Sequence, residues 1–122
     1  SAELANYIQT IRLPYNLNTL SQVAAEAAFG DRKFLRNTIE KNAAERVLWE
    51  QTLDEVGGTY YKSGANFIFM SVPNANGLAD EWLAKGYQVR RGQRDNWLRV
   101  TLPTASDGAI MRSILKDYMA RQ

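Results

Sequence analysis

Four arginines within ten residues, Arg90, Arg91, Arg94 and Arg99, are the side chains of this sequence best suited to binding chemistry. From 97 onward, strand-like alternation places Leu98, Val100 and Leu102 on one face and Trp97, Arg99 and Thr101 on the other. A guanidinium held on a sheet beside an aromatic ring is suited to bidentate capture of a carboxylate or a phosphate. Spacing alone leaves a second interpretation open, in which the arginines are the solvated edge of an ordinary basic hairpin.

The residue types that are absent exclude several kinds of site. The chain contains no cysteine and no histidine. Disulfides, thiolate chemistry, histidine-based acid–base catalysis and Ser-His-Asp triads are therefore excluded, and the two commonest transition-metal ligands are missing. We expect no metal site and no catalytic residue within this chain.

Length and charge indicate one ordinary globular domain. The chain has 122 residues and a net charge of +2, too small by itself to predict nucleic-acid or membrane binding. Its longest apolar stretch lies within 65–72, which is far too short to cross a bilayer. We therefore expect a cytoplasmic protein without a membrane or nucleic-acid partner.

The first thirty residues predict two helices. Apolar residues at helical spacing run from Leu4 to Ile11, and Pro14 would stop that helix. Asn18 is a candidate N-cap for a second helix that ends with Gly30 at its C-terminal cap. A stripe of small residues on this second helix suggests that it is clamped between other elements.

A long helix is predicted from Asp31, as its cap, to residue 55 or 56, where Gly57 and Gly58 follow. We expect its charges to face solvent. Its apolar stripe consists of Leu35, Ile39, Ala43 and Val47, widened by Phe34, Leu48, Leu53 and Val56.

The remaining segments alternate between strands and helices. A short strand is expected at 59–62 and a fully buried one at 65–72, and the arginine hairpin 87–102 supplies two more. Asn76 would cap a helix through Lys85 that buries Leu78, Trp82 and Leu83, and Thr104 with Asp107 would cap the last helix. The apolar stripe of that last helix consists of Ile110, Met111, Ile114, Leu115, Tyr118 and Met119. The fold class is thus α+β, a small sheet covered by helices on one face.

Four segments in this order resemble the C-terminal part of the histidinol-phosphate aminotransferase family, which belongs to the fold-type I pyridoxal-phosphate aminotransferases. They are residues 13–18 (LPYNLN), 65–68 (ANFI), 86–90 (GYQVR) and 98–101 (LRVT). The resemblance extends from about Leu4 to Met119. It implies a helical linker at 1–30 and the small C-terminal domain at 31–122.

The resemblance also implies roles for individual residues. Arg99 matches the arginine that grips the substrate carboxylate, and would hold the carboxylate of glutamate or help to hold the phosphate of histidinol phosphate. Arg90 would bind the phosphate or the distal carboxylate of glutamate. Asn66 matches a position near the substrate-binding arginine, whereas Tyr15 and Asn16 match a segment that is either a hinge or a substrate contact. The chain departs from the family in having Leu102-Pro103 where a glycine usually follows, and in a short loop between Arg90 and Arg99.

The resemblance implies pyridoxal 5'-phosphate as the cofactor of a longer parent enzyme. None of the lysines of this chain matches the lysine that forms the family's Schiff base; they are Lys33, Lys41, Lys62, Lys85 and Lys116. We therefore expect an excised small domain that binds no cofactor itself. Its expected partners are its own large domain, a second subunit of a homodimer and a small amino-acid or phosphate substrate. Without them, the isolated chain should expose apolar surface around residues 4–28 and self-associate.

The implied reaction converts histidinol phosphate and 2-oxoglutarate into imidazole-acetol phosphate and glutamate, in histidine biosynthesis. Aromatic aminotransferases and threonine-phosphate decarboxylases share the superfamily and remain alternatives. So do a stand-alone module that binds anions or nucleic acid through its arginines, and a structural domain without a ligand. The low net charge and the lack of exposed aromatic residues between the arginines argue against nucleic acid.

Overall fold

The computed structural model describes residues 1–12, 17–92 and 96–122, and divides into two compact units, Ser1–Arg36 and Asn37–Gln122. The predicted roles of Pro14, Tyr15, Asn16 and Arg94 fall outside the described residues. Among the described residues, no helix is both long enough and apolar enough to cross a membrane.

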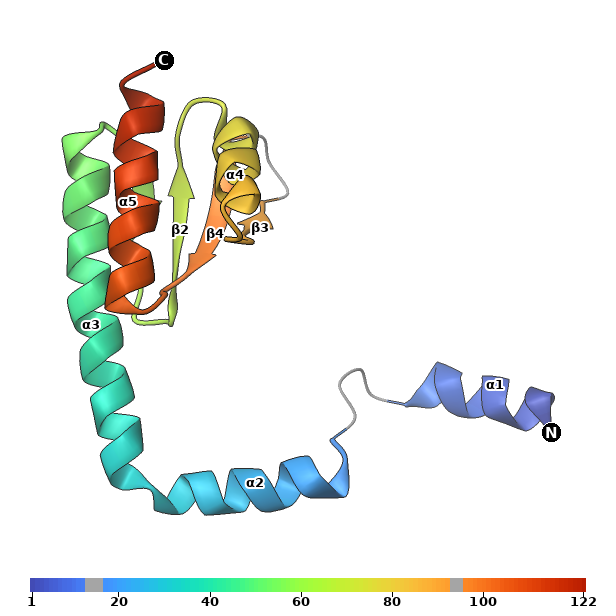
Figure 1. Ribbon diagram of the computed structural model, residues 1–122. Helices are drawn as coiled ribbons and strands as arrows, with labels where there is room; N and C mark the ends of the chain where they lie inside the picture. Colours follow the sequence, from blue (N-terminus) through green and yellow to red (C-terminus); the bar gives the residue numbers. More distant parts are fainter. Residues whose placement is uncertain (13–16, 93–95) are drawn as a thin grey trace. The chain divides into compact units, whose positions relative to one another are not determined.

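The first unit consists of α1 (Ala2–Ile11), α2 (Thr19–Gly30) and the start of α3 (Arg32–Glu55) (Figure 1). Two predicted caps are confirmed: the Asn18 side chain accepts from the Ser21 N–H at 2.8 Å, and Asp31 accepts from the Phe34 N–H at 2.9 Å. Gly30, however, is the last helical residue, and the C-cap is Asp31 with φ −85°.

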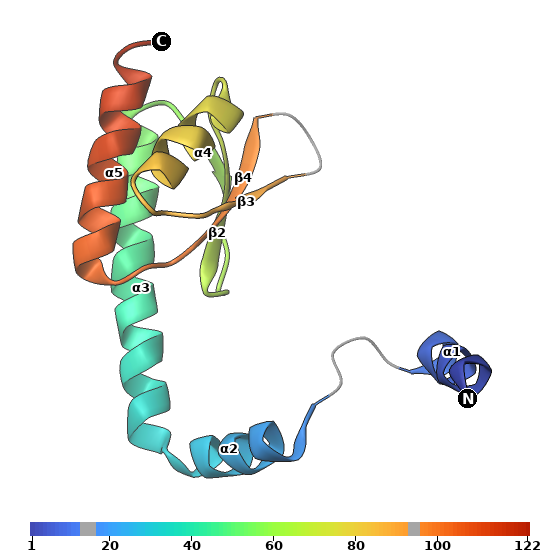
Figure 2. The same cartoon turned by 45° about the vertical axis from the view of Figure 1, so that its right-hand side comes forward.

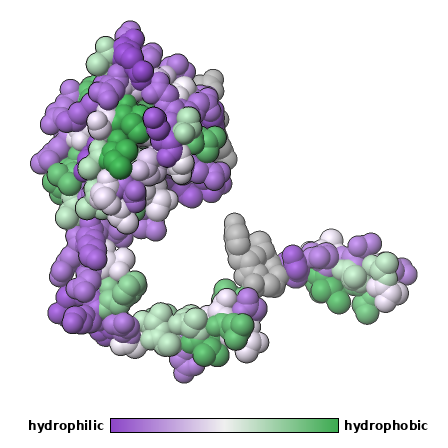
Figure 3. Space-filling model, in the orientation of Figure 1, coloured by the Kyte–Doolittle hydropathy of each residue, from purple (hydrophilic) through white to green (hydrophobic). Residues whose placement is uncertain are grey.

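Neither α1 nor α2 buries a residue, so the prediction that α2 is clamped between other elements is wrong for this chain by itself. Apolar side chains lie on the surface of both helices (Figure 3), and Ile11 and Leu20 are more than four-fifths exposed. An apolar periodicity identifies the apolar face of a helix, but it does not show whether the element that covers this face belongs to the same chain.

The second unit is a sheet with helices on one side (Figure 2). Its strands are β1 (Thr59–Tyr61), β2 (Phe67–Ser71), β3 (Arg90–Arg91) and β4 (Trp97–Thr101), and its other helices are α4 (Ala75–Ala84) and α5 (Ala105–Met119). The strand order is β1-β2-β4-β3, and each neighbouring pair is antiparallel. The predicted α+β class, with helices on one face, is confirmed.

The core lies between that covered face and the helices α3, α4 and α5. Ile68 and Met70 of β2 and Leu98 and Val100 of β4 point into it, and the helices contribute the buried residues Trp49, Leu53, Leu78, Trp82, Met111, Leu115 and Tyr118. The Trp49 and Trp82 rings meet edge to face, with centroids 5.9 Å apart, so α3 and α4 are joined at the centre of the core.

The predicted apolar stripe of α3 is only partly confirmed. Leu53 is fully buried and Val56 packs against the core, as predicted. Leu35, Ile39 and Val47 are instead about half exposed, and the fully buried Trp49 was not predicted. Leu35 belongs to the first unit, whereas Ile39 and Val47 belong to the second and still remain outside its core.

Not all charges of α3 face solvent, because Glu45 is buried and pairs with Arg112 of α5. Gly108 makes room for that carboxylate, since a Cβ at this position would collide with the Glu45 side chain. Arg112 also lies over the Trp49 ring, 5.9 Å from its centroid. Glu45, which the sequence analysis assigned to solvent with the other charges of this helix, thus forms an ion pair that joins α3 to α5.

Three smaller predictions are also corrected. β2 is buried on one face only, because an antiparallel sheet with helices on one side leaves alternate residues uncovered. The N-cap of α4 is Asn74, in the left-handed region at φ 46°, rather than Asn76. Leu83 and Ile110 are about half exposed, at the margins of their helices.

Candidate anion-binding site

The uncovered face of the sheet carries one cross-strand row of four residues. In the strand register Tyr61 is opposite Phe69, Phe69 is opposite Arg99, and Arg99 is opposite Arg90. Directly opposite residues of antiparallel strands point to the same face. The row therefore runs from two aromatic rings on β1 and β2 to two guanidinium groups on β4 and β3.

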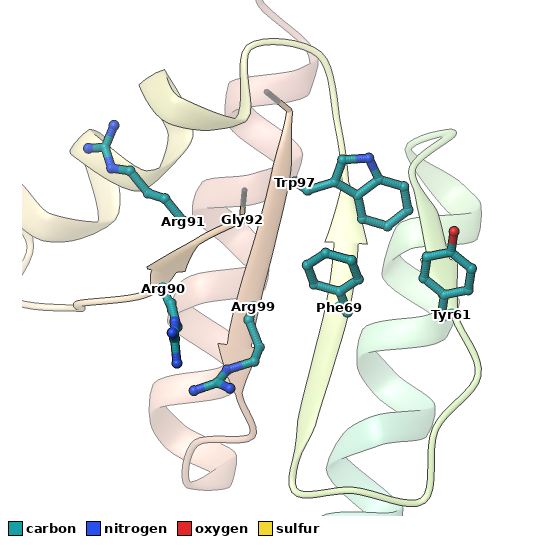
Figure 4. A pocket seen from close by; sticks show the side chains of 7 residues that line it. All are labelled: Tyr61, Phe69, Arg90, Arg91, Gly92, Trp97 and Arg99. Carbon is teal, nitrogen blue, oxygen red and sulfur yellow. The ribbon is translucent and has the colours of Figure 1, made fainter. Parts of the chain in front are cut away.

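A hollow of about 450 Å³ lies over this row (Figure 4). Its lining residues are Tyr61, Phe69, Arg90, Arg91, Gly92, Trp97 and Arg99. In the close view the side chains of Arg90 and Arg99 extend in the same direction, whereas Arg91 extends to the other side of β3. The hollow thus has a cationic half and an aromatic half.

The hairpin that joins β3 to β4 fixes the positions of the two arginines. The Gly92 N–H donates to the Trp97 carbonyl at 2.7 Å, and Asn96 adopts a left-handed φ of 68°. A Cβ on Gly92 would lie 2.9 Å from the Trp97 Cβ and carbonyl oxygen, so the close approach of the strands requires glycine there. This contact sets the register that places Arg90 opposite Arg99.

Two like charges directly opposite each other repel, and an anion bound between them would relieve that repulsion. None of the carboxylates that the structure describes forms an ion pair with Arg90 or Arg99. Arg99 lies over the Phe67 ring, with its guanidinium carbon 5.1 Å from the centroid, which supports the side chain without neutralising it. The site is therefore suited to a carboxylate or phosphate oxygen between the two guanidinium groups.

The two other predicted residues nearby behave differently. Arg91, one of the four arginines of the hairpin, is exposed and forms an ion pair with Asp80 of α4. Asn66 is exposed and does not line the hollow. Its backbone carbonyl accepts from the Leu102 N–H at 2.9 Å, which continues the pairing of β2 with β4 beyond the strand end.

Sequence reasoning missed the aromatic residues Tyr61 and Phe69. Phe69 was assigned to a fully buried strand, and Tyr61 to a short strand without a role. The signal was present in the alternation, because an antiparallel strand paired with Leu98-Arg99-Val100 must share its uncovered face. Because Tyr61 is 62% exposed and lines the same hollow as the arginines, the prediction that no exposed aromatic residues accompany them is wrong.

The residues of the hollow do not fit pyridoxal 5'-phosphate. Binding that cofactor as a Schiff base requires a lysine amine, and no lysine lines the hollow. Nor do the described residues contain a group of three or more carboxylates that could hold a metal ion. The arrangement offers anion binding next to an aromatic surface.

The sequence of this chain matches a known protein family. Residues 1–114 match the family model "Aminotransferase class I and II". Curated relatives include the histidinol-phosphate aminotransferase of Limosilactobacillus fermentum, 48% identical over 98% of this chain, and that of Lactiplantibacillus plantarum, 46% identical over 98%. The chain spans about a third of the length of these relatives, 33% and 34% respectively.

Solved structures share the fold. A histidinol-phosphate aminotransferase from Clostridium acetobutylicum matches with a TM-score of 0.75 at 21% identity, covering 98% of this chain and 39% of that one. A putative aminotransferase from Burkholderia pseudomallei matches with a TM-score of 0.76 at 21% identity, covering 98% of this chain and 38% of that one. At these identities the likeness concerns the fold alone.

Proposed function

This chain belongs to the class I and II aminotransferases, and on that premise we propose that it is the substrate-recognition region of a histidinol-phosphate aminotransferase. The reaction would convert histidinol phosphate and 2-oxoglutarate into imidazole-acetol phosphate and glutamate. The 46% and 48% identities to histidinol-phosphate aminotransferases favour this substrate over those of the aromatic aminotransferases and threonine-phosphate decarboxylases.

The observation that carries the proposal is the placement of Arg90 opposite Arg99 on the uncovered face of the sheet. Arg99 would bind the carboxylate of glutamate and help to bind the phosphate of histidinol phosphate. Arg90 would bind the phosphate or the distal carboxylate of glutamate. Since both arginines stand on paired strands, the sheet sets the separation of their backbones, and binding of the anion has only to order the two side chains.

Asn66 remains a predicted substrate contact. It lies at the start of β2, one residue before Phe67, whose ring supports Arg99. A role for its side chain requires that the substrate extend beyond the hollow toward this end of the strand.

Pyridoxal 5'-phosphate, the cofactor expected of this family, supplies an electron sink for amino-group transfer when bound. Because the hollow of this chain has no lysine, we propose that the cofactor is held by a separate, larger domain of the same enzyme. This chain would then act by binding anionic groups and orienting them, and by excluding water from them when the domains close.

The exposed apolar residues of α1 and α2 support this assignment. They would be covered by the large domain and by the second subunit of a homodimer, with residues 1–30 as the linker and 31–122 as the C-terminal small domain. Leu4, Tyr7, Ile8, Leu20 and Val23 are all at least half exposed, and such surfaces mark interaction sites. The isolated chain should therefore self-associate, and the parent enzyme would work in the cytoplasm.

Anion binding by this chain tests the proposal directly. Titration with inorganic phosphate, glutamate and histidinol phosphate should give saturable binding that Arg99→Ala abolishes. Arg121→Ala is the matched control, because Arg121 is an exposed arginine that is paired with Glu81 and does not line the hollow. Equal binding by the wild type and Arg99→Ala would contradict the assignment of the site.

A further inference from the structure

The first turn of α4 contains the only asparagine of the sequence that precedes a glycine, Asn76 before Gly77. Asn76 is exposed, and it is not the helix cap that the sequence analysis expected, because Asn74 takes that position. Neither the core nor the anion site uses its side chain.

An asparagine before a glycine loses its side-chain amide more readily than other asparagines do. Once a base has taken its proton, the backbone nitrogen of the glycine attacks the asparagine Cγ, a five-membered succinimide forms, and ammonia leaves. Water then opens the ring at one of its two carbonyls and returns a proton to the nitrogen, which gives aspartate or isoaspartate. The net reaction exchanges an amide and a water molecule for a carboxylate and an ammonium ion. Glycine favours the attack because it has no side chain and adopts the required backbone conformations at little cost.

The cap of α4 withholds the Gly77 nitrogen from this reaction. The Gly77 N–H donates to the Asn74 carbonyl at 3.0 Å, and its nitrogen lies 3.4 Å from the side-chain oxygen of Asn74. The same carbonyl accepts from the Tyr118 hydroxyl of α5 at 2.9 Å, so the cap is anchored to a second helix. Attack on Asn76 therefore requires that this turn open and release the nitrogen.

The packing around Tyr118 also requires a glycine at position 77. A Cβ there would lie 2.5 Å from the Tyr118 hydroxyl oxygen and 2.8 Å from the side-chain nitrogen of Asn74. A larger residue would therefore displace the groups that anchor the cap. The fold thus needs the glycine that makes Asn76 reactive, and the same contacts protect Asn76 from the reaction.

We propose that Asn76 is a site of spontaneous deamidation, and that its rate is set by how often the cap between Asn74 and Tyr118 opens. The two products differ in their effect on the fold. Aspartate at 76 places a negative charge near a helix N-terminus, where it is favourable. Isoaspartate adds a methylene group to the main chain, which moves the N–H groups of Gly77 and Leu78 away from the Asn74 carbonyl that accepts from both.

Peptide mass spectrometry of the 122-residue chain measures the reaction at each asparagine, because a carboxylic acid in place of an amide changes the mass of the peptide. The chain is incubated at mildly alkaline pH, with and without urea. We expect Asn76 to react before the other asparagines. Its reaction should be at least about tenfold faster in urea, because unfolding removes the protection that the cap gives.

Two variants test the role of the cap. Asn74→Ala and Tyr118→Phe should each accelerate the reaction of the native chain at Asn76 by about fivefold, as expected when a helix cap is lost. Asn74→Asp is the matched control, because it keeps an oxygen that accepts from the Gly77 N–H, and its rate should equal that of the wild type. Thr104→Ala removes the cap of α5 instead, and should also leave the rate at Asn76 unchanged.

Acceleration at Asn76 in the two cap variants, with exposed Asn66 unaffected, would support control by local opening. Unchanged rates in these variants, or equal rates in the native and the urea-denatured wild type, would overturn the inference. So would an earlier reaction at another asparagine, or an equal acceleration at Asn66, since global unfolding of a variant would expose every asparagine. A variant that fails to fold cannot imitate the result in urea, because that comparison uses the wild type alone.

Discussion

Arg112 of α5 donates to the carboxylate of Glu45 of α3, and both side chains are almost completely buried, with 11% and 5% of their surface exposed. Removing one partner of a buried ion pair leaves the other charge without compensation. Arg112→Leu should therefore lower the free energy of unfolding by roughly 3–5 kcal/mol, measured by urea denaturation. The double variant Glu45→Leu/Arg112→Leu should recover much of that loss.

The surface pair of Lys116 with Glu55 is the control, because its side chains are 50% and 59% exposed. Lys116→Ala should change the unfolding free energy by less than about 1 kcal/mol. Equal losses for Arg112→Leu and Lys116→Ala would show that the Glu45–Arg112 pair is not buried in solution.

Gly108 is predicted to be intolerant of substitution although it lies inside a helix, where alanine is normally the better residue. The added Cβ of Gly108→Ala would collide with the Glu45 carboxylate and push it away from Arg112. We expect a net loss of about 1–3 kcal/mol in thermal or urea denaturation. Ser113→Ala, an exposed position of the same helix, should be within about 0.5 kcal/mol of the wild type.

Arg99→Ala should impair catalysis in an enzyme that contains this chain. Truncating one partner of a buried, charge-assisted contact costs roughly 2–5 kcal/mol, which corresponds to a loss in kcat/KM for glutamate of at least about thirtyfold. Steady-state kinetics would measure it, with Arg121→Ala, an arginine outside the hollow, as the control. An unchanged kcat/KM in Arg99→Ala would remove this residue from the substrate site.

The stability of the second unit should fall at alkaline pH. Burial, with the nearby Glu81 carboxylate, raises the pKa of the Tyr118 phenol above its usual 10.0, and the hydroxyl donates to the Asn74 carbonyl at 2.9 Å. A raised pKa in the folded state stabilises the protein fully below the usual pKa, and this contribution is lost as pH rises through the folded value.

Urea denaturation at pH 8 and above pH 10 would measure the effect. In Tyr118→Phe, which keeps the ring but cannot ionise, stability should decline less steeply over that range. An identical decline in the wild type and Tyr118→Phe would assign the alkaline loss to other groups, of which Tyr60 and Tyr87 also have raised pKa values through burial.

Much of the fold was predictable because local signals were decisive. The Asn18, Asp31 and Thr104 caps and the turn after α3 were visible in the sequence, and so was the alternation that turns Arg99 away from Leu98 and Val100. The arginine pair followed from that alternation and from the family resemblance. What the residues alone did not supply was the register that places Arg90 opposite Arg99.

Features that depend on contacts between residues far apart in the sequence were not predicted. The burial of Glu45 depends on Arg112 and Gly108, more than sixty residues further along the chain, and no local pattern reports such a partner. The apolar residues of α3 before residue 47 matched a core stripe in spacing, yet their spacing holds no information about what covers them. Tyr61, Phe69 and Trp97 stand on three different strands, so the strand pairing had to be known before they could be recognised as neighbours.

The alternation along β2 and β4 divides the residues of each strand into a set that faces the core and a set that faces solvent. Ile68, Met70, Leu98 and Val100 pack against the helices, whereas Phe69, Trp97 and Arg99 line the hollow on the uncovered face. Substitutions at the second set remove no side chain from the core, because alternate residues of a strand point to opposite faces. A library confined to residues 61, 69 and 97 would therefore vary the surface beside the arginine pair without changing the buried core.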